Sequence, residues 1–174
     1  MNFADNASIT YITGHGAVAE IQVSDGGMCN LRNCSWGSWS SHSRRGDLDY
    51  MFLHCCQALS LGTHWRNRWQ CTPQRMRPFA GLHIACGFRS NFTFTTSWDL
   101  GDEVAQNLED GYPVRGSWLE AVEDHNYYLI GINNIPCVMF VRPYKYDDIY
   151  DYKRYDRWYH DPDYILDKTY LVYN

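Results

Sequence analysis

Two short apolar segments, each running into a reactive side chain, restrict most strongly what this chain can fold into. The first, Ile9–Thr13, precedes His15, which stands between two glycines. The second, Leu48–Leu53, leads to the pair Cys55-Cys56. Short runs rich in β-branched and aromatic residues predict buried strands. Open α/β sheets place their sites where the carboxyl ends of parallel strands meet. If these two strands are neighbours, His15 and Cys56 meet at one edge of the sheet.

The rest of the pattern alternates between strands and helices. The continuous hydrophobicity of the second segment predicts a central strand that is buried on both faces. Further strands are expected at Ala17–Val23, Leu82–Phe88 and Pro136–Val141. One helix is expected after Asp99 as N-cap, and another over the region of Trp118. This order predicts an α/β three-layer sandwich with a mainly parallel central sheet.

Composition sets the class and the expected surroundings. A chain of 174 residues fits one domain, which we place at residues 1–143, and the Tyr- and Asp-rich segment 144–174 is expected to pack on it. The net charge of −5 argues against nucleic acid as the main partner. No apolar run approaches the roughly 20 residues of a membrane span. The seven cysteines and the lack of an export signal favour reduced thiols in the cytoplasm.

The order strand, His-Gly, strand, small residue, Cys resembles that of the caspase-like cysteine peptidases, the clan of caspases, legumains, gingipains and separases. His15 and Cys56 are 56 − 15 = 41 residues apart, which suits that pattern. The stretches Gly46–Gly62 and Phe79–His83 also look like a less studied caspase-like domain family of unassigned function. The resemblance covers roughly residues 8–140 and implies a caspase-like α/β fold.

The resemblance also implies roles for individual residues. His15 matches the general base and Cys56 the nucleophile, while the backbone N–H groups of Gly16 and Cys56 match the oxyanion hole. Cys55 falls on the small residue before the nucleophile, usually Ala or Gly, which leaves open which of the two thiols reacts. A glycine lets the backbone approach a substrate carbonyl closely, and fixed donors stabilise the oxyanion.

The family pattern usually begins with a strand and a helix before the His block, and this chain has only eight residues there. The sheet is therefore expected to lack its first strand. We expect the exposed edge to be covered by residues 1–7, by the tail from Tyr144, which is the preferred cover, or by another chain in a homo- or hetero-oligomer.

Several other side chains have both a functional and a structural interpretation. Candidate substrate-binding residues are Cys55, Trp36, Trp65 and Asp47, although the tryptophans fit a core equally well. His54 should point away from Cys55 and pack, and His83 should be a hydrogen-bonded core residue. A metal site is conceivable only from Cys29, Cys34, His42 and Cys55, whose spacing is not that of a structural zinc site, so no metal and no cofactor are expected.

Two functions follow as hypotheses. The first is a cysteine peptidase that cleaves a peptide or protein substrate through an acyl-enzyme on Cys56, with His15 as acid and base. The second is a catalytically silent caspase-like module that binds a protein or peptide partner through its Tyr-rich tail.

Overall fold

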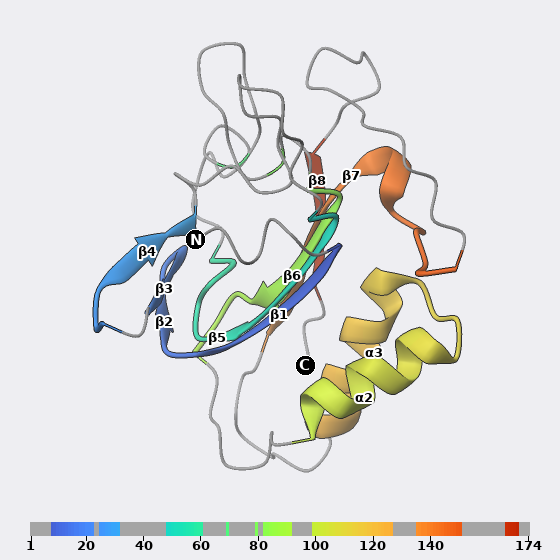
Figure 1. The fold of residues 1–174 in the computed structure, drawn as a ribbon, viewed down its shortest axis with the longest axis horizontal. Helices are drawn as coiled ribbons and strands as arrows, with labels where there is room; N and C mark the ends of the chain where they lie inside the picture. The colour runs from blue at the N-terminus through green and yellow to red at the C-terminus, as the bar shows by residue number, and fades with distance from the viewer. Residues whose placement is uncertain are drawn as a thin grey trace.

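A five-stranded sheet forms the centre of the molecule (Figure 1). The computed structural model describes residues 8–22, 25–31, 48–60, 69, 79, 82–91, 99–126, 135–150 and 166–170. The sheet order is β1-β5-β6-β7-β8. The strands span Ile9–Gly14 (β1), Tyr50–Cys55 (β5), Ile84–Phe88 (β6), Pro136–Val141 (β7) and Leu166–Tyr170 (β8). The chain is thus an α/β protein, as the sequence predicted.

The sheet is mixed, and its parallel half carries the two segments singled out above. β1 pairs with β5, and β5 with β6, in parallel. β7 and β8 join in antiparallel fashion. β5 is buried along its whole length between two neighbours, which confirms the central position predicted for it. Its continuous apolar sequence is what a strand covered on both faces requires.

A second, small antiparallel sheet follows β1 directly. It consists of β2 (Gly16–Ala17), β3 (Glu20–Gln22) and β4 (Met28–Asn30). The single strand expected over Ala17–Val23 was therefore wrong. Ala19 adopts a left-handed backbone, with φ of 59°, and the chain reverses there into a hairpin. Apolar periodicity did not show this reversal, because alanine is not a typical turn residue.

Helices α2 (Leu100–Glu109) and α3 (Val114–Asn126) lie together against one face of the sheet (Figure 1). Asp99 occupies the N-cap position of α2, as predicted, although its carboxylate makes no capping hydrogen bond. Gly111, with φ of 84°, supplies the left-handed residue after α2. Among the described residues, no helix is both long and apolar enough to cross a membrane.

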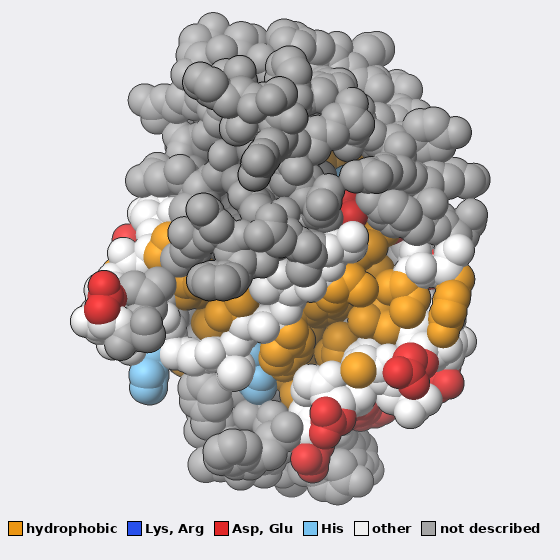
Figure 2. All heavy atoms as spheres, in the orientation of Figure 1, with side chains coloured by type: hydrophobic (Ala, Val, Ile, Leu, Met, Phe, Trp, Pro, Cys, Tyr) orange, Lys and Arg blue, Asp and Glu red, His pale blue; other side chains and the backbone are white. Residues whose placement is uncertain are grey.

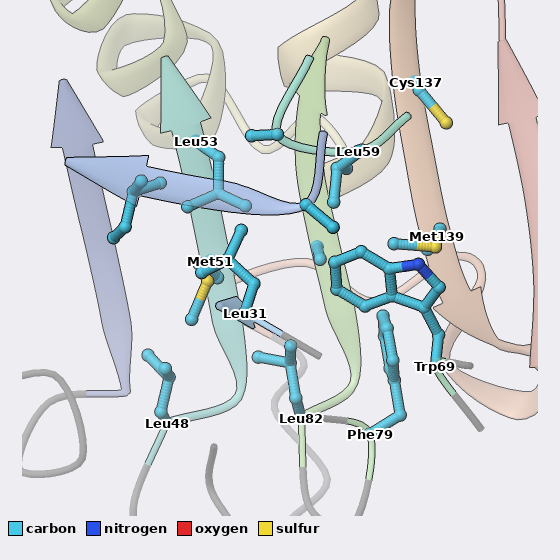
Figure 3. Close-up of a cluster of buried hydrophobic side chains, with 14 of the residues drawn as sticks. Leu31, Leu48, Met51, Leu53, Leu59, Trp69, Phe79, Leu82, Cys137 and Met139 are labelled. Carbon is cyan, nitrogen blue, oxygen red and sulfur yellow. The ribbon is translucent and has the colours of Figure 1, made fainter. Parts of the chain in front are cut away.

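The two faces of the sheet carry two separate cores. On the helix side, Tyr50 and Phe52 of β5 pack with buried residues of α2 and α3, among them Trp118. The indole N–H of Trp118 donates to the carbonyl oxygen of Gly87, 3.2 Å away. On the other side, Met51 and Leu53 join the core drawn in Figure 3. That core also contains Leu31, Leu48, Leu59, Trp69, Phe79, Leu82, Cys137 and Met139.

The edge strands differ in how well they are covered. Of the tail, residues 166–170 form β8, which pairs with β7 and not with β1. Within the described residues, the tail therefore covers the edge opposite β1 and not the β1 edge, which precedes the His block. Ile9 and Tyr11 of β1 remain 39% and 36% exposed. Figure 2 shows hydrophobic side chains still visible between the sheet and the two helices.

A cluster of polar side chains links the segment after β7 to the amino ends of β5 and β6. His83 Nδ1 lies 3.3 Å from Asp147 Oδ2, and its Nε2 lies 3.7 Å from Asp49 Oδ1. The His83 ring stacks on Tyr144 with a centroid distance of 3.6 Å. The Tyr50 hydroxyl donates to the same Asp147 carboxylate at 3.2 Å. His83 is thus a hydrogen-bonded core residue, as predicted.

We expect Asp147→Ala to lower the free energy of unfolding by about 1–3 kcal/mol, because it leaves two buried polar partners, His83 and Tyr50, without their shared acceptor. Urea denaturation followed by tryptophan fluorescence measures the change. Asp124→Ala, an exposed position on α3, is the matched control and should stay within about 0.5 kcal/mol of the parent. Equal effects of the two substitutions would contradict the role assigned to the cluster.

Candidate active site

His15 and Cys56 directly follow the ends of two paired strands. β1 and β5 are parallel neighbours, and their last paired residues are Gly14 and Cys55. Neighbouring strands run about 4.8 Å apart, so the residues that follow this pair start from adjacent backbone positions. The predicted adjacency of the two strands is confirmed, and the sheet brings the His-Gly and Cys-Cys segments to one edge.

Gly16 presses against the cysteine pair so closely that no other residue fits. A Cβ atom at this position would lie 2.6 Å from the carbonyl oxygen of Cys56 and 2.9 Å from Cβ of Cys55. It would also lie 3.1 Å from the carbonyl oxygen of Glu20. Two of these three neighbours are backbone atoms, which cannot turn aside as a flexible side chain would. The glycine after His15 is therefore needed for close approach between the two segments.

The hairpin after β1 holds the backbone around His15. The Gln22 N–H donates to the carbonyl oxygen of His15 at 2.9 Å. In this antiparallel ladder Gly16 pairs with Ile21, and His15 and Gln22 form the next pair. Hydrogen-bonded and non-hydrogen-bonded pairs alternate, so the bond between Gln22 and His15 makes Gly16–Ile21 a non-hydrogen-bonded pair. The Gly16 N–H is therefore directed away from β3. The His15 side chain is exposed at the end of the strand.

The two cysteines have different surroundings. Cys55 is fully buried, and its thiol donates weakly to the carbonyl oxygen of Ile12 at 3.7 Å. The pKa of Cys55 is raised from its ordinary 9.0 to about 12, first by burial and then by the neighbouring Cys56, against the lowering effect of a hydrogen bond from the Gly14 backbone. Cys56 is only partly buried, against the helix-side core. Since the thiolate is the reactive form, Cys55 is the inert member of the pair near neutral pH.

The turn after Cys56 contains an unusual backbone conformation. Gln57 has φ of 52°, and Ala19 of the β2–β3 turn has φ of 59°. No other non-glycine residue in the described ranges has a positive φ. These two residues are hydrogen-bonded to each other: the Ala19 N–H donates to the carbonyl oxygen of Gln57 at 3.3 Å. A left-handed L-residue costs about 1–2 kcal/mol, so this conformation is held by its surroundings.

His54 points to the face opposite Cys55, as the strand alternation predicted. It packs by its ring against Phe88 and Tyr11, and its Nδ1 lies 2.9 Å from the Tyr11 hydroxyl. Burial, followed by the charges of Cys55 and Asp102, raises the pKa of Tyr11, which stays a neutral phenol. Sequence reasoning missed Tyr11, Gln57 and Ala19, since no motif or spacing marks a contact made across strands.

Some predicted residues lie outside the described part of the chain. These are the candidate substrate-binding residues Trp36, Trp65 and Asp47, and Cys34 and His42 of the conceivable metal site. Within the ranges that are described, no group of three His, Cys, Asp or Glu could hold a metal ion. The cysteines described there form no disulfide bond, namely Cys29, Cys55, Cys56, Cys86 and Cys137.

Fold and site together define an α/β protein in which a histidine and a cysteine follow neighbouring parallel strands. The chain belongs to the family described as Domain of unknown function (DUF6345), whose model matches residues 1–151. A comparison with curated proteins finds no significant match. The description of this family states no activity.

We expect Gly16→Ala to destabilise the protein by about 1–3 kcal/mol, because its Cβ would force the Cys56 backbone or the hairpin to move. Thermal unfolding measures the loss. Gly116→Ala on α3 is the matched control, since the nearest atom to its Cβ would be Pro113 Cδ at an ordinary 3.7 Å. Because alanine also favours a helix over glycine by up to about 1 kcal/mol, the Gly116→Ala control should not destabilise the protein. If the Gly16→Ala variant were as stable as the parent, the close contact between Gly16 and the Cys56 backbone would be contradicted.

Alkaline solution should weaken the fold. The pKa of Cys55 and that of Cys137 are both raised by burial to about 12, from an ordinary 9.0. The unfolded chain therefore loses these protons from about pH 9, whereas the folded protein keeps them until about pH 12. Stability is fully present below pH 9 and falls as the pH rises between these values. Denaturant midpoints at pH 8, 9.5 and 10.5 test this, and the double variant Cys55→Ala/Cys137→Ala should flatten the slope.

Proposed function

We propose that the protein is a caspase-like cysteine peptidase, with Cys56 as nucleophile and His15 as general acid and base. The observation that carries the proposal is the close contact of Gly16 with the backbone of Cys56. This contact lies directly after the paired last residues of β1 and β5, Gly14 and Cys55. A general base needs to reach its thiol directly or through a small movement, and apo sites are often loose. Backbone hydrogen bonds at His15 and at Gln57, the residue after Cys56, hold the two segments in place and so position the histidine and the cysteine.

In the proposed reaction, His15 takes the proton from Cys56 and the thiolate attacks the substrate's carbonyl carbon. The N–H groups of Gly16 and Cys56 stabilise the resulting oxyanion, and the orientation of the Gly16 N–H away from β3 supports that role. Collapse breaks the C–N bond, and His15 protonates the departing amine. Water, deprotonated by His15, then hydrolyses the thioester on Cys56.

The choice of Cys56 rather than Cys55 rests on burial. Cys55 is enclosed in the core and its pKa is raised, whereas Cys56 is partly accessible. The substrate class is a peptide or a protein. The proposed setting is the reducing cytoplasm, where the thiol of Cys56 stays available as a nucleophile.

The alternative is a catalytically silent caspase-like module that binds a protein or peptide partner. The observation that favours it is the exposed apolar surface of β1, where Ile9 and Tyr11 stand at the edge of the described sheet. Such surfaces are common at interaction sites. The two functions differ in one measurable property, the reactivity of the Cys56 thiol.

Brief treatment with iodoacetamide at pH 7, followed by peptide mass spectrometry, should label Cys56 before the other six cysteines. His15→Ala should slow this labelling about tenfold, because no general base then takes the proton of the Cys56 thiol as it reacts. Cys55→Ala should leave the labelling of Cys56 intact, and Cys56→Ala should abolish the fast phase. A peptide library should then reveal cleavage that Cys56→Ala removes.

Slow and equal labelling of all the cysteines, with no cleavage in the library, would overturn the peptidase and favour the partner-binding module. Fast labelling of Cys55 would instead move the nucleophile by one residue.

A further inference from the structure

The polypeptide around Cys56 is fixed on both sides. Upstream, Cys55 is held in β5 by its pairing with Gly14. Downstream, Ala58 and Leu59 are fully buried in the core opposite the helices. The chain has to change direction between these fixed points, and the residue that makes the turn is Gln57, with φ of 52°.

The backbone of Gln57 is bonded to three separate parts of the molecule. Its N–H donates to the carbonyl oxygen of Ser90, beyond the end of β6, at 2.9 Å. Its carbonyl oxygen accepts from the N–H of Ala19, in the β2–β3 turn, at 3.3 Å. The same oxygen accepts from the N–H of Ser60 at 2.9 Å. The turn after Cys56 is thus tied at once to β6, to the hairpin that carries Gly16, and to its own continuation.

We propose that Gln57 is a positioning residue for the Cys56 thiol and acts through its left-handed backbone. This inference rests on the proposed function, since it assigns Gln57 to the site where Cys56 reacts. Strained residues persist only where the surrounding structure holds them, and they cluster at active sites. Here the strain sits on the residue next to the nucleophile, and its hydrogen-bond partner Ala19 is strained in the same way.

The side chain of Gln57 has a lesser part. Its Nε2 donates to Asn91 Oδ1 at 2.8 Å, in a solvent-exposed hydrogen bond. Exposed polar contacts of this kind exchange readily with water and contribute little. The backbone conformation, which sets the direction of Cys56 relative to His15 and Gly16, is therefore the property to be tested.

Two substitutions separate the backbone from the side chain. Gln57→Gly keeps the left-handed conformation without cost and removes the amide, whereas Gln57→Val opposes that conformation because its side chain is β-branched. Labelling of Cys56 by iodoacetamide is followed from pH 5 to pH 9. We expect Gln57→Val to slow labelling at pH 7 about tenfold and to give the pH profile of the His15→Ala variant. Gln57→Gly should keep both within about twofold of the parent.

A control and a milder variant keep the test decisive. Asp147→Ala, in the polar cluster at the opposite end of the parallel strands, should lower thermal stability without changing the Cys56 profile. Gln57→Thr takes the place of Gln57→Val if the latter does not fold. The proposal is overturned if the β-branched variants keep the parent profile, or if Gln57→Gly loses as much reactivity as they do. Slow labelling of Cys56 in the unsubstituted protein would instead remove the proposed function, whatever the variants do.

Discussion

The parallel pairing of β1 with β5 is the interaction on which the rest of this structure depends. It aligns Gly14 with Cys55, so that the next residues along each strand, His15 and Cys56, leave the sheet together. A shift of one residue in this register would exchange the two faces of either strand. Met51 and Leu53 would then leave one core, and Tyr50 and Phe52 the other, so the burial of both faces of β5 stabilises the register that forms the site.

Beyond the ends of β1 and β5, close packing between the two segments determines their relative position. Gly16 lies against the backbone of Cys56, and the hairpin it begins returns to bond the turn after Cys56 through Ala19 and Gln57. The small sheet β2-β3-β4 therefore forms one wall of the site, and its buried Ala19 and Ile21 join the core that contains Cys55. The same arrangement separates the two thiols, because it encloses Cys55 and leaves Cys56 partly accessible.

The opposite end of the sheet is stabilised by different means. His83, between Asp49 and Asp147, holds the segment after β7 against the amino ends of β5 and β6. Antiparallel pairing of β8 then covers β7. The polar cluster and the candidate active site thus lie at opposite ends of the parallel strands.

The sequence alone determined the elements whose signal is local. Apolar runs predicted β1, β5, β6 and β7, Asp99 predicted the start of α2, and strand alternation predicted the opposite orientations of His54 and Cys55. Each of these follows from side-chain spacing along a single segment. The pairing of β1 with β5 was also within reach, because two apolar segments that lead to a histidine and a cysteine suggest a shared edge.

Tertiary structure decided the features that depend on contacts between distant segments. The reversal at Ala19 and the turn at Gln57 place ordinary residues in a conformation that their own propensities oppose, and only the surrounding hydrogen bonds and burial hold them there. The pairing of β8 with β7 and the contact between Tyr11 and His54 likewise join residues with no sequence relation. For the same reason the sequence could name the Cys55-Cys56 pair but not choose between its members: their chemical types are identical, and they differ only in how deeply the folded chain buries them.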